Sequence, residues 1–364
     1  RTWGNLQGCS GALAIVESAL AAKNRLCLVI TESAKSAARL ESEMAFFAKG
    51  ADLPVLHFPD WETLPYDVFS PHQDIVSERL ATLAKLPTTR RGILVAPITT
   101  LMHRLAPPTY VSANSFTHAK GDNLDLGALR LRLDNAGYRS VATVYEHGEY
   151  AVRGSLVDIF PMGSHWPIRI DLFDDEIDSL RTFDPETQVS LEQTPEINLL
   201  PAREFPLDKP GIKAFLDNWH AHFDVDPRRC TVYQDVKNGQ HAQGLEYYLP
   251  LFFSETSTLF DYLPDNALIF TEGDLPEAAE HFWKEVAERY EEYSVDRQRP
   301  LLAPLQLYIP SGEMFSQLKR YGRTDLAPVA VNGQQHFNIA AEPVEDLSVD
   351  SRADAPLAAL QRHL

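Results

Sequence analysis

Short apolar runs and helical patterns alternate along the first hundred residues. Three apolar or nearly apolar runs are typical of strands covered on both faces of a sheet, and they occupy residues 26–30, 55–58 and 92–97. Apolar residues at three- and four-residue spacing predict helices over residues 37–47, 75–86 and 99–105. Because strands that alternate with helices need crossover connections, this pattern predicts an α/β domain with a parallel sheet.

The pattern changes after Pro107-Pro108. A helix is predicted from Leu126 to a stop at Gly137. Short alternating segments follow that predict strands joined mainly by hairpins, at residues 141–144, 156–160, 168–173 and 177–183. This part of the chain therefore predicts a small α+β domain.

The α/β pattern returns after residue 200. A helix is predicted over 212–219, a buried strand over 267–270 and a helix over 276–290, whereas the chain from about 296 onward is Pro-rich and predicted to be irregular. We therefore expect an α/β domain interrupted by an inserted α+β domain. The expected divisions are 1–112 and 201–340 for the two parts of the α/β domain, 113–200 for the insertion, and 341–364 for a linker with the start of a following domain.

Composition argues against several classes of protein. The net charge is −18, so the chain as a whole should repel nucleic acid, and protein partners are favoured. Three scattered cysteines without a CxxC pair argue against a disulfide framework or a zinc site, so no metal ligand is expected, and they suit a reducing cytoplasm. No apolar run is long enough for a membrane span, and no secretory signal pattern is present.

The segment that begins at Gly8 resembles a phosphate-binding loop without its functional side chains. Gly8 and Gly11 suit the turn, but the three positions that complete such a loop, Gly-Lys-Ser/Thr, hold Leu13, Ala14 and Ile15. The lysine charge and the magnesium-binding hydroxyl are therefore both missing. Taken alone, these glycines also fit an ordinary turn before a helix.

A second position supports descent from an NTPase. The predicted strand 267–270 runs into Thr271 and Glu272, where an active helicase-type enzyme would place a magnesium-binding Asp and a catalytic Glu. Thr271 stands at the Asp position. Two degenerate motifs at the two appropriate places favour a degenerate RecA/helicase-like domain that has lost its catalytic residues.

One predicted strand of the insertion carries a candidate binding surface. Side chains alternate across a strand, so Ile168, Ile170 and Leu172 share the core face, and Arg169, Asp171 and Phe173 share the other. An Arg beside a Phe on an outward face suits an interface, because aromatic residues and Arg are enriched there. The alternative is a Phe covered by a neighbouring loop.

Several long segments resemble the bacterial transcription-repair coupling factor family. They occupy residues 60–75, 146–154, 173–181, 244–248 and 299–302, and the similarity covers nearly the whole chain. The first two-thirds also resembles UvrB, more distantly. The resemblance is to the N-terminal, UvrB-like module, in which a degenerate α/β domain is interrupted by a small domain that binds UvrA.

The resemblance implies a module that recruits UvrA in nucleotide excision repair and has no catalysis or cofactor of its own. It places UvrA contacts on Arg153 and Arg169, and the strand pattern adds Phe173 to the same predicted UvrA-binding surface. Contact with RNA polymerase and DNA, and ATP-driven translocation, are implied for later domains. Another domain of the full-length protein is expected to mask the UvrA surface.

Two alternatives are an ATP-dependent helicase or translocase and a damage-binding protein like UvrB. Ala14 and Thr271 oppose the first, and the acidic charge opposes the second. The damage-clamping hairpin of UvrB also has no room here, since only residues 66–71 match its position. We expect Trp61, Tyr66 and Phe69 to serve in core and loop packing instead.

Overall fold

A parallel sheet of seven strands forms the centre of the computed structural model, which describes residues 1–342, 355, 357 and 361. The predicted linker and following helix lie almost wholly outside these residues. The strand order is β15-β1-β14-β13-β2-β4-β3, and every pairing is parallel. The strands are β1 (Thr2–Gly4), β2 (Leu26–Thr31), β3 (Val55–His57), β4 (Gly92–Pro97), β13 (Leu268–Glu272), β14 (Gly322–Leu326) and β15 (His336–Asn338).

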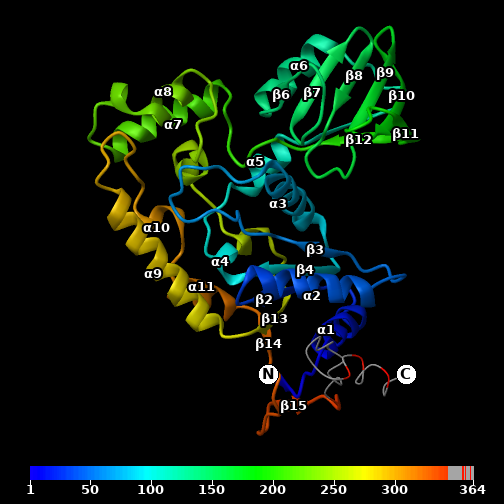
Figure 1. Cartoon of the computed structure of the whole chain (residues 1–364), viewed down its shortest axis with the longest axis vertical. Coiled ribbons are helices and arrows are strands. Elements are labelled where there is room, and N and C mark those ends of the chain that lie inside the picture. The colour runs from blue at the N-terminus through cyan, green and yellow to red at the C-terminus, as the bar shows by residue number, and fades with distance from the viewer. Residues whose placement is uncertain (343–354, 356, 358–360, 362–364) are drawn as a thin grey trace.

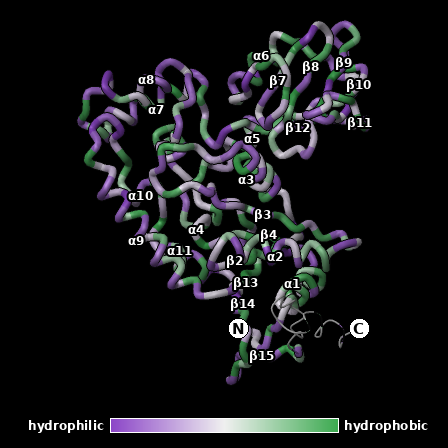
Figure 2. Tube along the Cα trace, viewed as in Figure 1, coloured by the Kyte–Doolittle hydropathy of each residue, from purple (hydrophilic) through white to green (hydrophobic). Residues whose placement is uncertain are grey.

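Helices cover both faces of this sheet, as the continuous apolar strands predicted (Figure 1). On one face, Cys27, Val29 and Ile93 pack with α1 (Ser10–Ala21) and α2 (Ala34–Phe47). On the other, Leu28 and Leu94 pack with α3 (Gln73–Lys85), α4 (Ile98–Leu101) and α9 (Leu275–Tyr293). The hydropathy colouring shows apolar residues along the central strands (Figure 2). The predicted α/β fold is confirmed.

The region after residue 296, predicted to be irregular, contains regular structure. It forms α10 (Pro304–Leu307), α11 (Ser311–Leu318), β14 and β15, and the two strands flank β1 in the sheet. The sequence pattern missed β1, β14 and β15 because β1 and β15 are only three residues long and β14 is mostly polar. These strands form because neighbouring strands pair with them, and their own sequences carry no periodic apolar pattern.

A second sheet lies at the far end of the molecule from β15 (Figure 1). Its order is β11-β10-β9-β8-β7-β6. The strands are β6 (Arg139–Ser140), β7 (Glu149–Arg153), β8 (Leu156–Ile159), β9 (Ile168–Phe173), β10 (Glu176–Phe183) and β11 (Ser190–Gln193), with α6 (Leu126–Asn135) nearby. The strand predicted at 141–144 is wrong: Val144 instead packs with Ala151, Phe160 and Phe183 in a small separate cluster.

The chain enters and leaves this unit through one antiparallel pair, β5 (Phe116–Ala119) with β12 (Glu196–Leu199). The helix predicted over 99–105 is shorter than expected. It ends at Leu101, and a new helix, α5 (Pro108–Ala113), begins after Pro107. The remaining elements are α7 (Lys209–His222), α8 (Thr231–Lys237) and the 3₁₀ helices Leu86–Thr88, Pro227–Arg229, Leu245–Phe252 and Leu259–Tyr262.

A buried ion pair joins α3 to the segment that follows the inserted unit. Arg79 and Glu204 are both buried, with Nε–Oε1 and Nη2–Oε2 distances of 2.6 and 3.2 Å. Arg79 Nη1 also donates to the Pro59 carbonyl, and Trp61 Nε1 donates to Glu204. Burial alone would raise the pKa of Glu204, but the charge and hydrogen bonds of Arg79 outweigh it, and the pKa is lowered.

Replacing Arg79 should test how far the fold depends on this pair. Arg79→Ala leaves Glu204 as an unpaired buried charge, which should lower the free energy of unfolding by about 3–5 kcal/mol in chemical denaturation. Arg79→Met combined with Glu204→Leu should recover much of the loss, since neither charge then remains buried. Lys213→Ala, which removes an exposed pair with Asp217, is the control and should change stability by less than about 1 kcal/mol. An Arg79→Ala chain as stable as wild type would contradict this account.

Candidate functional site

The outward face of the six-stranded sheet brings the predicted binding residues together. Asp158 on β8 is in register with Ala151 on β7 and Arg169 on β9. Because side chains alternate along a strand, Arg153 lies on the same face, two residues beyond Ala151, and so do Asp171 and Phe173. The core-facing residues Ile168, Ile170 and Leu172 are buried, as predicted.

Asp158 is the centre of this surface. Its carboxylate is buried and accepts hydrogen bonds from Arg169 Nε and Nη2, at 2.7 and 3.0 Å, and from Arg153 Nη2. Arg169 Nη1 also donates to the Gln188 carbonyl at 3.2 Å. The guanidinium of Arg169 lies 4.7 Å from the centre of the Phe183 ring. The hydrogen bond to Asp158 raises the pKa of Arg169, so the guanidinium stays charged.

The predicted site residues differ in how much they present to solvent. Phe173 is 76% exposed at the end of β9, and the Arg153 side chain is 51% exposed. Arg169 lies on the outward face as predicted, but its side chain is only 20% exposed because its guanidinium is bonded to Asp158. Arg153 and Phe173 are therefore available for direct contact, and Arg169 mainly holds the charge arrangement in place.

Sequence reasoning missed two members of this surface. Asp158 interrupts the otherwise apolar strand 156–159, and a lone acid in such a strand is a signal of a buried partner. Arg181 on β10 lies directly opposite Arg169 and is exposed, which adds a third guanidinium to the face. The register between the two strands, which the sequence alone does not specify, was needed to place it there.

The two segments predicted to be degenerate nucleotide-binding motifs meet at the carboxyl edge of the seven-stranded sheet. The turn at Gly8 has a φ of 54° and leads into α1, and β13 ends nearby at Glu272. A cavity of about 240 Å³ lies between them, and Gly8, Gly11, Glu32, Arg39 and Glu272 are among the residues that line it. Nucleotides bind at this edge in many α/β proteins.

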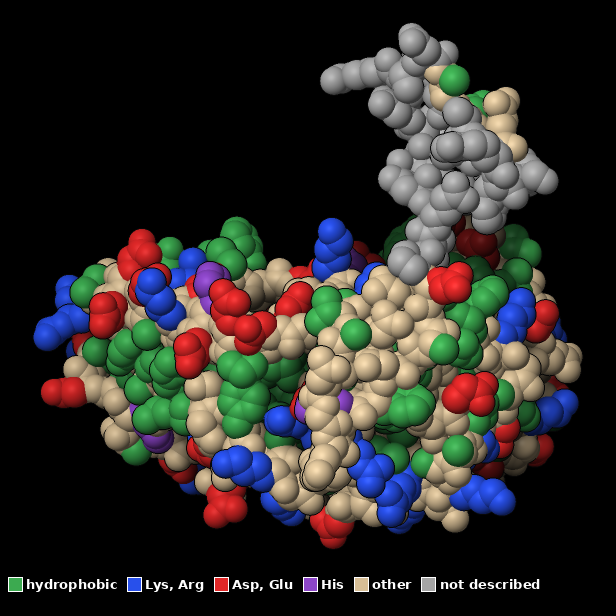
Figure 3. Space-filling model, turned by 90° about the horizontal axis from the view of Figure 1, so that it is seen from below, with side chains coloured by type: hydrophobic (Ala, Val, Ile, Leu, Met, Phe, Trp, Pro, Cys, Tyr) green, Lys and Arg blue, Asp and Glu red, His purple; other side chains and the backbone are tan. Residues whose placement is uncertain are grey.

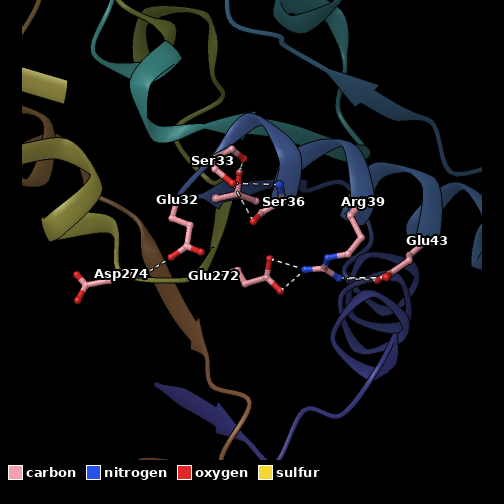
Figure 4. Close-up of polar contacts among 8 residues, drawn as sticks. Glu32, Ser33, Ser36, Arg39, Glu43, Glu272 and Asp274 are labelled. Atoms are coloured by element: carbon pink, nitrogen blue, oxygen red, sulfur yellow. Dashed lines mark hydrogen bonds and ion pairs between the residues drawn. The ribbon is translucent and has the colours of Figure 1, made fainter. Parts of the chain in front are cut away.

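Two carboxylates, those of Glu32 and Glu272, line this cavity. Glu272 pairs through both oxygens with Arg39, at 2.7 and 2.8 Å, and Arg39 also pairs with Glu43 (Figure 4). Glu32 accepts a hydrogen bond from the Asp274 amide, and its carboxylate occupies the space that a Cβ on Gly273 would need. Arg39, which lines the cavity, is thus already neutralised by protein carboxylates.

The three residues predicted to stand at the phosphate and magnesium positions add no charge. Ala14 ends in a methyl group, and Ile15 is buried against the sheet in the core beneath α1. Thr271 is buried, and its hydroxyl donates to Asp325 at 2.6 Å. The loop before α1 is itself tied to a neighbouring segment, because the amides of Asn5 and Leu6 donate to the carbonyls of Val329 and Ala327.

The aromatic residues of the loop after β3 have different environments. Trp61 and Tyr66 are buried, as predicted, and Tyr66 donates a hydrogen bond to the Leu302 carbonyl. The prediction for Phe69 is wrong, because its side chain is largely exposed at the turn.

Side chains of both charges are spread over the face seen in Figure 3, where green apolar side chains also lie exposed.

The chain is similar to known proteins, both over the inserted unit and over its whole length. Residues 116–205 match the UvrB interaction domain family. The chain is 44% identical over 366 residues to the transcription-repair-coupling factor of Escherichia coli, covering all of this chain and 32% of that protein. It is 43% identical to the Haemophilus influenzae protein of the same name, covering 99% of this chain and 31% of that protein.

The chain belongs to the transcription-repair coupling factor family. It covers about a third of the length of these relatives and corresponds to their N-terminal, UvrB-like module. A more distant family member, from Bacillus subtilis, is 29% identical over 301 residues. Within the described part of this coupling-factor module, none of the helices has the length and apolar character needed to cross a membrane.

Stability measurements should separate Arg169 from Phe173. Arg169→Ala removes two of the hydrogen bonds to the buried Asp158, so it should lower the free energy of unfolding by about 1–3 kcal/mol. Phe173→Ala removes an exposed side chain and should change it by about 0.5 kcal/mol or less. Urea denaturation of both variants provides the comparison. Equal stability of Arg169→Ala and wild type would show that Asp158 does not depend on Arg169.

Proposed function

We propose that this chain is the UvrA-recruiting module of a transcription-repair coupling factor and has no catalytic activity of its own. UvrA binding is assigned to the inserted domain, residues 113–200, which separates the two parts of the degenerate α/β domain, 1–112 and 201–340. The observation that carries the proposal is the outward face of the six-stranded sheet. Arg153, Arg169 and Phe173 lie together on it, inside the segment that matches the UvrB interaction domain.

The chemistry of this face suits a partner that carries carboxylates beside an apolar pocket. Arg153 uses one guanidinium nitrogen for Asp158, and its exposed side chain leaves other donors for a bidentate contact with a carboxylate. Phe173 offers an exposed aromatic ring two strands away, at roughly 10 Å by strand spacing. Arg and aromatic side chains dominate the energetics of many protein interfaces.

The remaining activities of the family are assigned outside this chain. Contact with RNA polymerase, contact with DNA and ATP-driven translocation belong in this proposal to other parts of the full-length protein. One of those parts covers the UvrA-binding face until it is released. The cytoplasm, where nucleotide excision repair takes place, is the proposed location.

The cavity between α1 and β13 is proposed to be a vestigial nucleotide site. Its two lining carboxylates, Glu32 and Glu272, would repel a triphosphate, and Arg39 is already paired with Glu272 and Glu43. This favours a binding module over the second candidate, an ATP-dependent helicase. A UvrB-like damage-binding function is disfavoured by the net charge of −18.

Binding of UvrA should depend on the exposed members of the face. Arg153→Ala and Phe173→Ala should each weaken UvrA binding by about 2 kcal/mol, or roughly thirtyfold. Thermal melting should stay close to wild type for Phe173→Ala and fall less for Arg153→Ala than for Arg169→Ala, because Arg153 donates only one hydrogen bond to the buried Asp158. Arg169→Ala should weaken binding as well, but with a loss of stability. Biolayer interferometry with immobilised UvrA gives the affinities.

Two variants serve as controls for that measurement. Phe46→Ala removes an equally exposed aromatic, 73% exposed on α2, and should bind UvrA like wild type. Ile170→Ala removes a buried side chain of the same strand and should instead destabilise the fold by about 2–5 kcal/mol. If Arg153→Ala and Phe173→Ala remain folded and bind UvrA normally, the proposed surface is wrong.

Nucleotide binding should be absent from the isolated chain. Titration calorimetry with Mg-ATP should give no saturable heat, because the lysine and magnesium positions hold Ala14, Ile15 and Thr271. Millimolar Mg-ATP should also leave the melting temperature unchanged, since a ligand stabilises only the state that it binds. A saturable heat in the micromolar range would overturn the assignment of a vestigial site.

A further inference from the structure

Three potential metal ligands converge at the free edge of the seven-stranded sheet, away from both sites described above. They are Glu41 on α2, His57 at the end of β3 and Glu78 on α3. His57 Nδ1 lies 3.1 Å from Glu78 Oε1 and 3.4 Å from Glu41 Oε2. The three ligand atoms all lie within 4.8 Å of one another.

The fold brings these residues together from opposite sides of the sheet. The buried residues of α2 pack in the cluster on one face, and those of α3 pack in the cluster on the other. β3 is the edge strand of the sheet, so Glu41 and Glu78 reach around this edge from the two faces and meet at His57. The position of His57 is fixed, because β3 pairs with β4 and the His57 carbonyl accepts a hydrogen bond from Thr82.

The surroundings of the imidazole favour a cation. Neither Glu41 nor Glu78 forms an ion pair with a lysine or arginine anywhere in the described part of the chain. Two carboxylates thus share one partner that carries at most a single positive charge.

We propose that Glu41, His57 and Glu78 form a binding site for a Zn²⁺ ion that clips α2 and α3 together across the sheet edge. Zinc takes imidazole nitrogen and carboxylate oxygen at about 2.0–2.2 Å, usually in tetrahedral geometry. Neighbouring ligand atoms of such a tetrahedron are roughly 3.3 Å apart, close to the two distances from His57 Nδ1. Mg²⁺ and Ca²⁺ prefer oxygen ligands alone and suit this set less well.

The site leaves one tetrahedral position for a water molecule or for a side chain of another protein. Glu78 is exposed and Glu41 partly exposed, so this position faces solvent and the ion can enter without unfolding the chain. The ion would also shield the edge of β3, where unpaired backbone groups could otherwise pair with another chain.

Zinc titration of the chain after EDTA treatment tests the site. Calorimetry with ZnCl₂ should show one tight ion per chain, and ZnCl₂ should raise the melting temperature of the wild type. His57→Ala and Glu78→Gln should each weaken this binding by about tenfold or more, as expected when a direct ligand is lost. Co²⁺ in place of Zn²⁺ should give visible absorption bands that both variants lose.

The matched control is His118→Ala. His118 is also partly buried but faces a single carboxylate, that of Asp122 at 3.9 Å, so its loss should leave zinc binding unchanged. Glu78 is exposed, and Glu78→Gln therefore keeps the test valid if His57→Ala fails to fold. If the wild type binds no zinc, or if Glu78→Gln binds it as tightly as wild type, the cluster is only an ion-paired histidine and the proposal is wrong.

Discussion

The pairing of Arg79 with Glu204 is the constraint on which the arrangement of the two sheets depends. The chain leaves the α/β core through β5 and returns through β12, and Glu204 follows shortly after that return. Its ion-pair partner is Arg79 on α3, so the returning segment must reach α3 for the carboxylate to be buried at acceptable cost. Since the pKa of Glu204 is lowered in the fold, this contribution is present at neutral pH and is lost as the pH falls through that lowered pKa.

Further hydrogen bonds hold the unit with the six-stranded sheet against α3. The Gly163 amide donates to Ser77 Oγ on α3 at 2.7 Å, and His147 contacts Asp74 at 2.7 Å. Within the sheet, the buried Asp158 fixes Arg153 and Arg169 in one arrangement. A surface whose side chains are held in place before binding loses less conformational entropy on association. Together these contacts support the proposal that the outward face recruits a partner.

The sequence predicted the elements with strong apolar patterns and missed those without. The strands β2 and β4 are wholly buried, and the alternation along β9 placed Ile170 and Phe173 on their correct faces. By contrast, β14 and β15 are polar or exposed, and their place in the sheet follows from neighbours distant in sequence. The same limit applies to the candidate site: Arg169 was identified, but its burial against Asp158 depends on the register of β8 with β9.

The face carrying Phe173 is the surface through which we propose that the chain binds UvrA. The most direct measurement places a photo-cross-linking benzoylphenylalanine at position 173, or at the equally exposed position 46, and irradiates each chain with UvrA. We predict a covalent adduct with UvrA from position 173 and none from position 46. Equal adducts from both positions, or none from position 173 while the chain still co-elutes with UvrA, would contradict the account.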